Sequence, residues 1–283
     1  MIHQFTGRIE NNLAGLSDLA KLEATTRGLF LDQLTIDFSY ANWFEANLCA
    51  ALGAILNRTS ANLNTVKLEN IPSGIESIFK KNGFLSHFGG ETRPDYYGTT
   101  ITYSSFGRGD VKAFHAYLQS QLLGRSDLPK MTDLLKREIA RSILEIFVNA
   151  ITHGNCSQVF ACGQFFPSKQ RIDFSIVNLG TTIQQNVSNF LRSNLTAAEA
   201  IQWALQEGNT TRTGPIPGGL GLSILKQFLK LNQGRAHIYS GGGCWTQSGA
   251  LEAFADSAND FGGTMVVVEF NLSDSTSYRL STE

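Results

Sequence analysis

One long amphipathic helix constrains the fold more than any other segment of the sequence. The spacing predicts it over "KMTDLLKREIARSILEIFVNAITHGN" (130–155), with Thr132 or Asp133 as its N-cap. Apolar residues recur at helical intervals along one side: Ile139, Ile143, Phe147 and Ala150. Such a face packs against another apolar layer. The helix therefore predicts a layered fold.

Strand candidates that follow this helix supply the second layer. They lie at 157–166, 171–180, 235–241 and 262–270. Further helical patterns flank them and lie between them. These patterns cover 110–124, about 196–207 and 222–231. We therefore expect residues 110–283 to form one α/β sandwich, with a mixed sheet and a helical layer.

The sequence before Gly89 alternates strand and helix patterns over shorter distances. Strands are predicted at 34–39 and 64–71, and helices at 42–58 and at 73–84, where Ser73 opens the helix. This alternation implies a sheet covered by helices. We divide the chain into a small N-terminal α/β domain at 1–92, a linker at 93–109 that holds an edge strand at 99–106, and a C-terminal domain at 110–283.

Composition narrows the class of protein. The 283 residues suffice for two domains, and a formal net charge of -1 without a basic run disfavours a nucleic-acid partner. No apolar stretch approaches the roughly 18 residues of a membrane span, and the N-terminus "MIHQFTGRIENN" is too polar for a signal peptide. Four cysteines show no zinc-site spacing, which predicts buried thiols: Cys49, Cys156, Cys162 and Cys244. We expect a cytoplasmic protein with no membrane partner.

Three polar residues form a stripe on the long helix. Glu145, Asn149 and His153 are four residues apart each time, so they share one face. A solvated surface would explain the stripe, but Asn149 is a poor helix former in mid-helix. The alternative is a ligand site in which the Asn149 oxygen binds Mg²⁺ and Glu145 orients or deprotonates a nucleophile. His153 could meet a phosphate or only close the helix.

Two further elements suit a ligand site. The strand "DFSIVNLGTTI" (173–183) ends in Asn178 and Gly180, where a glycine lets a flat ligand approach the backbone. Three glycines, Gly218, Gly219 and Gly221, precede a helix whose first amides can hold an anion. The established phosphate-loop and dinucleotide motifs are both absent. The Gly/Pro-rich segment before these glycines is expected to act as a lid.

The order of these elements resembles the GHKL ATPase superfamily, which includes histidine kinases and anti-sigma-factor kinases. The resemblance covers about residues 110–272. Its motifs are E145-x-x-x-N149-A-x-x-H153, "VNLGTTI", G219-x-G221-L222 and "GGT" at 262–264. It implies a domain that binds ATP and Mg²⁺, and "NAITHG" is most similar to the anti-sigma kinase and histidine kinase branches.

The resemblance also implies a role for each matching residue. Glu145 corresponds to the general base, Asn149 to the Mg²⁺ ligand and His153 to a contact near the phosphates. The resemblance implies three further groups of positions that contact the nucleotide. The phosphates would be held by Gly219, Leu220, Gly221 and Leu222, and the adenine by Asn178, Gly180 and Thr264. A lid at about 186–218 would contribute Thr210, Thr211 and Arg212.

One position departs from the family pattern. The family usually carries an Asp that accepts a hydrogen bond from the adenine amino group, in a D-x-G-x-G pattern, whereas this chain has Asn178, Gly180 and Thr182. The neutral Asn oxygen still accepts such a bond, but a bond to a neutral group contributes about 0.5–1.5 kcal/mol against about 1.5–3 kcal/mol for a charged one. Weaker or less base-selective binding is the resulting hypothesis.

The N-terminal half resembles STAS domains over about residues 28–88, through its "IDFS" and "LENI" strand ends. In STAS antagonists a phosphorylatable Ser or Thr follows the first turn, but this chain has Ala46 and Asn47 there. The resemblance therefore implies a docking or dimerising module. The acceptor His of sensor histidine kinases is followed by an acidic residue, whereas Ala116 follows His115 here, so His115 is interpreted as a packed or surface residue.

Together these features predict a cytoplasmic regulatory protein that binds Mg-ATP. It either hydrolyses ATP or phosphorylates a partner protein, as a serine/threonine or histidine kinase, and it could act as a homodimer. One alternative is a nucleotide-gated binding switch without significant catalysis. A DNA-associated GHKL ATPase is a further alternative, which the missing basic surface disfavours.

Overall fold

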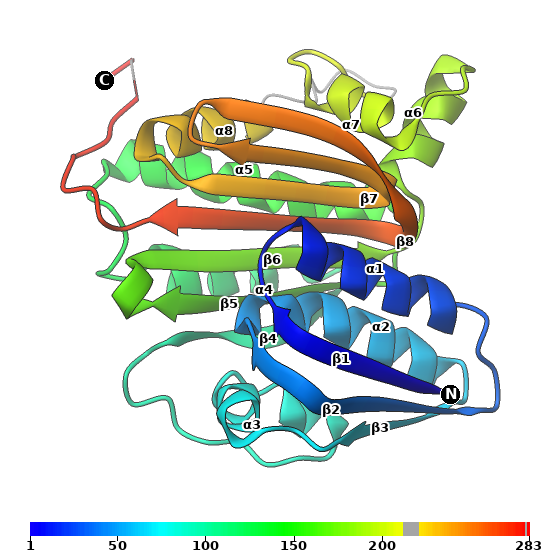
Figure 1. The fold of residues 1–283 in the computed structure, drawn as a ribbon. Helices are drawn as coiled ribbons and strands as arrows, with labels where there is room; N and C mark the ends of the chain where they lie inside the picture. Colours follow the sequence, from blue (N-terminus) through cyan, green and yellow to red (C-terminus); the bar gives the residue numbers. More distant parts are fainter. Residues whose placement is uncertain (212–220, 281) are drawn as a thin grey trace.

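Two β-sheets of different strand direction organise the protein (Figure 1). The computed structural model describes residues 1–211, 221–280 and 282–283. The first sheet has three parallel strands in the order β1 (Ile2–Ile9), β2 (Gln33–Phe44) and β3 (Thr65–Glu69). The second has five strands in the order β4 (Thr100–Gly107), β5 (Gln158–Phe166), β6 (Arg171–Leu179), β8 (Leu251–Asn271) and β7 (Arg235–Ser248). The chain is therefore a mixed α/β protein.

The second sheet differs from the mixed sheet that the sequence predicts, because each of its neighbouring pairs is antiparallel. Short connections explain the direction of two of these pairs: only Pro167–Lys169 and Gln170 separate β5 from β6, and a two-residue turn separates β7 from β8. Strands joined by so short a connection run antiparallel. β4 forms an edge of this sheet, as expected for 99–106, and it lies within the stretch 93–109 that the sequence assigns to a linker.

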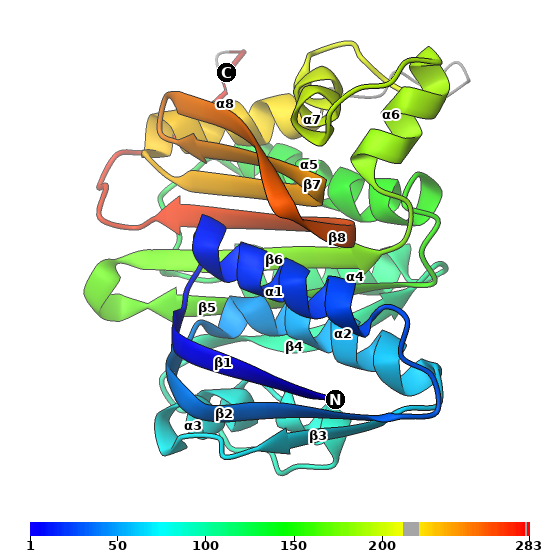
Figure 2. The same ribbon diagram turned by 45° about the vertical axis from the view of Figure 1, so that its right-hand side comes forward.

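Two helices of the N-terminal half lie between the sheets, as both ribbon views show (Figures 1 and 2). They are α1 (Leu13–Thr26) and α2 (Cys49–Ala61). α2 is apolar and buried from Cys49 through Leu56, as expected of a helix that is covered on both sides. Residues of both halves share the resulting core: Phe38, Phe44, Leu52, Phe160, Val177 and Met265. The N-terminal half therefore covers one face of the second sheet.

The other face of the second sheet is covered by α4 (Val111–Tyr117), α5 (Asp133–Thr152) and α8 (Gly221–Asn232). α5 is the long helix that the sequence predicts, and the Thr132 hydroxyl caps it by accepting a hydrogen bond from the Leu135 amide at 3.3 Å. Its predicted apolar face is buried against the sheet: Ile139, Ile143, Phe147 and Ala150. This packing fixes which face of α5 remains for the polar stripe.

Several elements begin elsewhere than expected. β1 and α1 were not predicted, and β2 extends through Phe44, which pairs with Ile9, so that α2 begins at Cys49 rather than near residue 42. α3 (Ser73–Lys81) and α7 (Ala197–Leu205) follow the predicted positions, whereas α6 (Ile183–Leu191) is additional. None of the helices in the described ranges has the length and apolarity needed to cross a membrane.

Candidate functional site

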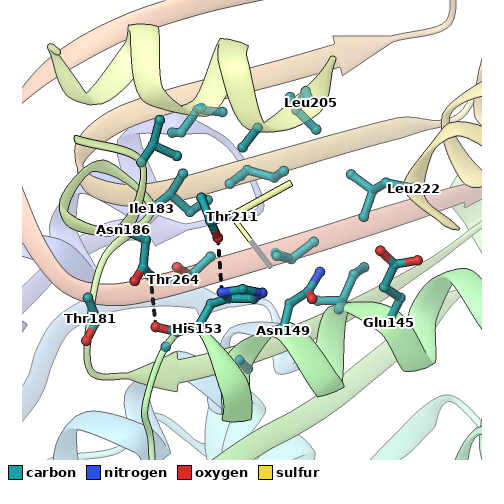
Figure 3. A pocket seen from close by; sticks show the side chains of 18 of the residues that line it. Glu145, Asn149, His153, Thr181, Ile183, Asn186, Leu205, Thr211, Leu222 and Thr264 are labelled. Carbon is teal, nitrogen blue, oxygen red and sulfur yellow. Dashed lines mark hydrogen bonds between the residues drawn. The ribbon is translucent and has the colours of Figure 1, made fainter. Parts of the chain in front are cut away.

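A pocket opens between α5, the second sheet and the α6–α7 pair (Figure 3). Eight of the predicted site residues line it, although they come from segments far apart in the sequence. These are Glu145, Asn149, His153, Asn178, Thr210, Thr211, Leu222 and Thr264. The candidate site is therefore one place in the fold.

The polar stripe of α5 forms one wall of this pocket. Glu145, Asn149 and His153 are half-buried, and Figure 3 shows all three projecting from the same side of the helix. The stripe is available because the apolar face of α5 is used against the sheet. A carboxylate, an amide and an imidazole thus line one side of a concave site instead of an open surface.

His153 connects α5 to the segments that cover the pocket. Its ring Nδ1 shares a hydrogen bond of 3.1 Å with the Thr211 hydroxyl, and its carbonyl accepts one of 2.8 Å from the Asn186 side chain (Figure 3). Its own amide donates to the Asn149 carbonyl at 2.8 Å and closes the helix. Thr211 lies where the sequence predicts the lid, so the end of α5 contacts that segment directly.

Asn178 and Thr264 form the opposite wall. They are paired across β6 and β8, and Asn178 is only 3% exposed. Within the described part of the chain, no group hydrogen-bonds to the Asn178 Nδ2. An unpaired buried donor costs about 1–3 kcal/mol, and this one belongs to a residue that lines the pocket.

Thr264 is held in place by hydrogen bonds to its surroundings. Its hydroxyl lies 2.9 Å from the Ser240 hydroxyl, which donates to the Gly263 carbonyl at 2.8 Å. Ser240 also accepts a hydrogen bond of 3.0 Å from the Ile183 amide, at the start of α6. One serine therefore joins β7, β8 and the first turn of the helix that covers the site.

Gly180 has a different position from the one expected. It does not line this pocket in the described structure. Its φ of +154° and its close packing explain the glycine instead: a Cβ there would lie 2.1 Å from the Gly154 carbonyl oxygen. Its amide donates to the Gly262 carbonyl at 2.9 Å. Gly180 therefore lets the end of β6 meet the end of α5.

Four predicted phosphate or lid residues are not among the described residues that line the pocket: Arg212, Gly219, Leu220 and Gly221. Gly221 is the first residue of α8, directly before the pocket residue Leu222. Arg212, Gly219 and Leu220 lie outside the described residues. The start of α8 is thus beside the pocket.

Sequence reasoning missed the apolar cover of the site. It comes mainly from α6 and α7: Ile183, Val187, Ile201, Trp203, Ala204 and Leu205. Both helices begin with a capping box, Thr182 with Gln185 and Thr196 with Glu199. The Thr-x-x-Gln pattern is visible in the sequence and could have located α6.

Comparison of the sequence with protein-family models finds no matching family, and comparison with curated proteins finds no relative.

Proposed function

We propose that the pocket binds a nucleoside triphosphate with Mg²⁺, and that residues 110–283 form a GHKL-type nucleotide-binding domain. The supporting observation is the convergence of the α5 stripe with Asn178 and Thr264 in one pocket. The N-terminal half, with its parallel sheet, is then a STAS-like unit of a regulatory protein. Its partners would be another protein or a second copy of the chain.

Asn178 fits the base end of such a ligand. An adenine edge offers an acceptor, N1, beside a donor, the 6-amino group, and a side-chain amide matches both at once. The buried, unpaired Nδ2 supplies the donor of this pair. The amide also matches the O6 and N1–H of guanine, so we expect less base selectivity than a carboxylate would give.

The α5 stripe fits the phosphate end. Among the described residues no three His, Cys, Asp or Glu side chains are grouped to hold a metal ion alone. Mg²⁺ suits such a site because it takes most of its ligands from water and phosphates, with the Asn149 oxygen as the protein ligand. Bound Mg²⁺ would neutralise phosphate charge. Glu145 would orient or deprotonate the attacking water or hydroxyl, and His153 would lie near the phosphates.

A test of this function separates binding from turnover. Glu145→Ala is expected to lower ATP hydrolysis, or phosphate transfer to a captured partner, by at least about 100-fold, because general-base catalysis contributes about 10²–10⁴-fold. Its dissociation constant for Mg-ATP, measured by calorimetry, is expected to stay within about threefold of that of the unsubstituted protein. The conservative Glu145→Gln is the matched variant. Retained turnover in either variant overturns the role of Glu145. Equal binding of ATP and GTP would mean that Asn178 does not select adenine over guanine.

A nucleotide-gated switch is the second candidate, favoured by the contacts of His153 with Thr211 and Asn186. Because phosphate binding beside His153 would alter these contacts, a nucleotide could reorder the cover of the site without being consumed. Hydrogen exchange with and without ATP distinguishes the two. Slowed exchange in α6 and α7, combined with no detectable phosphate release, supports the switch.

A further inference from the structure

Glu23 is a fully buried carboxylate of α1 that reaches across to the second sheet. Its Oε2 accepts hydrogen bonds from the Gly262 amide at 2.9 Å and from Arg27 Nη2 at 2.6 Å. Arg58 of α2 forms a further ion pair with Oε1. Buried carboxylates are costly unless they are paired, and two guanidinium groups and an amide satisfy this one. Although burial raises the pKa of Glu23, the hydrogen bonds from Arg27, Gly262 and Arg58 outweigh it and hold that pKa below its usual value.

The amide that Glu23 holds belongs to the base end of the pocket. The Gly262 carbonyl accepts a hydrogen bond from Gly180, and the next residue, Gly263, packs so closely that a Cβ would lie 2.0 Å from the Asn178 carbonyl oxygen. Thr264 follows and lines the pocket opposite α5. We call residues 178–180 with 262–264 the base wall. Glu23 thus fixes one end of the base wall without lining the pocket itself.

A cavity lies behind part of the base wall, at residues 179, 180 and 262. This cavity of about 540 Å³ lies between the N-terminal half and the end of the second sheet. It is lined by Glu23, Arg27, Arg58, Gly180, Gly262 and Asp260, among others. On this side α1 is joined to the end of β8 by polar contacts, Arg27 with Asp260 and Ser17 with Asn259. Among the described residues, the Glu23 hydrogen bond is the one from α1 that reaches the base wall itself, at the Gly262 amide.

We propose that Glu23 is a positioning residue of the base wall, through which the N-terminal half sets the affinity for the base of a bound nucleotide. The inference rests on the proposed nucleotide-binding function. It assigns α1 a part in ligand binding although no α1 residue lines the pocket. It also gives the N-terminal half a route for regulation, because any partner that shifts α1 shifts the base wall.

A double-mutant cycle tests the proposal, with the dissociation constant of Mg-ATP measured by calorimetry. Glu23→Gln keeps the size of the side chain and removes its charge, and is expected to weaken ATP binding by about tenfold. In a Thr264→Val background the same change is expected to cost less than about twofold, because the base contact is already lost. In a His153→Ala background, at the phosphate end, the factor stays at about tenfold.

A merely structural role predicts the same factor in all three backgrounds, and that result overturns the proposal. Asp18→Asn removes an exposed charge from the same helix and is the matched control, expected to leave ATP binding unchanged. If Glu23→Gln does not fold, Arg27→Gln replaces it, with a smaller expected loss because Arg58 still pairs with Glu23. Absence of ATP binding in the unsubstituted protein overturns the proposed function itself, whereas ATP binding that ignores Glu23 overturns only this inference.

Discussion

The N-terminal half meets the five-stranded sheet at two buried ionic contacts whose charges are balanced differently. In the Glu23 contact, one carboxylate faces two guanidinium groups, those of Arg27 and Arg58. In the Asp173 contact, three buried carboxylates surround Arg171: its Nη2 lies 2.6 Å from Glu45 and 3.1 Å from Asp173, and its Nη1 lies 3.0 Å from Glu269. More exposed partners complete both contacts, Asp260 beside Arg27 in the first, and Lys169 and Arg235 beside Glu45 and Glu269 in the second. The difference lies in the buried groups, because the first contact buries one carboxylate between two guanidinium groups and the second buries three carboxylates around one.

Hydrogen bonding separates the two contacts in the same way. Glu23 accepts hydrogen bonds with both oxygens, whereas Asp173 lies beside Arg171 at 3.1 Å and near the Asn11 amide, and among the described residues neither of its oxygens accepts a hydrogen bond of good geometry. The Nδ1 of His237 likewise has no hydrogen-bond partner in the described part of the chain. Burial and the neighbouring Glu269 and Glu45 raise the pKa of Asp173 well above its usual value, and Arg171 offsets this only in part. The fully hydrogen-bonded Glu23 carboxylate therefore holds the base wall in place. The Asp173 carboxyl lacks such hydrogen bonds, so the stability of its contact depends on its protonation.

The largest expected effect breaks the Asp173 contact. Arg171→Met leaves its surrounding carboxylates buried without a buried cation, so we expect a loss of about 3–5 kcal/mol in the free energy of unfolding. Urea denaturation at neutral pH measures it. Lys169→Met is the control, expected to cost less than about 1 kcal/mol, because Lys169 is 43% exposed and lies 3.5 Å from Glu45. If Arg171→Met lowers the free energy of unfolding by no more than Lys169→Met does, the three acids do not depend on Arg171 as their cation.

The Glu23 contact should tolerate the matching change better. Arg58→Met removes one of two cations, and Arg27 remains 2.6 Å from Glu23, so we expect a loss of about 2 kcal/mol. Arg27→Met should cost less than Arg58→Met, because Arg27 is 44% exposed and Arg58 22%. The same urea series gives all values. If Arg58→Met destabilises the protein as much as Arg171→Met, the proposed difference in charge balance is wrong.

The parts of the fold that the sequence predicted are those with a local signal. The α5 stripe follows from four-residue spacing, and its apolar face from helical periodicity, so the helix and its buried face match the prediction. β7 and β8 were underestimated, with strands predicted only at 235–241 and 262–270. Their extension carries Gly242 and Gly243 and a run of small and polar residues from Ala255 to Asp260, which are typical of a loop rather than a hairpin.

The contacts between the halves have no local signal. Glu23 lies 239 residues from Gly262 along the chain, and it is flanked by ordinary helix formers. Asp173 alternates with apolar residues along β6, as a surface acid on a strand would. Only the layering of α1 and α2 on the second sheet buries both carboxylates. The base wall could be predicted in part through Asn178 and Thr264, but its support from α1 could not.

The pH dependence of the Asp173 contact gives the smallest expected effect within any single pH unit. Because the pKa of Asp173 is raised by folding, the folded protein keeps a proton that the unfolded chain releases above the usual value of 3.8. Stability should therefore fall as pH rises above that value, by at most about 1.4 kcal/mol per pH unit, until Asp173 ionises in the folded state. Glu23 has the opposite sign: its lowered pKa contributes stability above its usual value of 4.5 that is lost as pH falls.

Asp173→Asn removes the Asp173 contribution to the pH dependence of stability and leaves that of Glu23, because Asn is neutral in both states. Urea denaturation between pH 4 and pH 8, with on the order of one measurement per pH unit, gives the free energy of unfolding at each pH. As pH rises, this free energy should fall less steeply in the variant than in the unsubstituted protein. Asp37→Asn is the control: hydrogen bonds from Ser39, Asn70 and Gln4 lower the pKa of this half-buried carboxyl, so its loss should leave the fall in stability at higher pH unchanged. Parallel curves for Asp173→Asn and the unsubstituted protein would mean that Asp173 is ionised in both states, and that the two contacts do not differ in protonation.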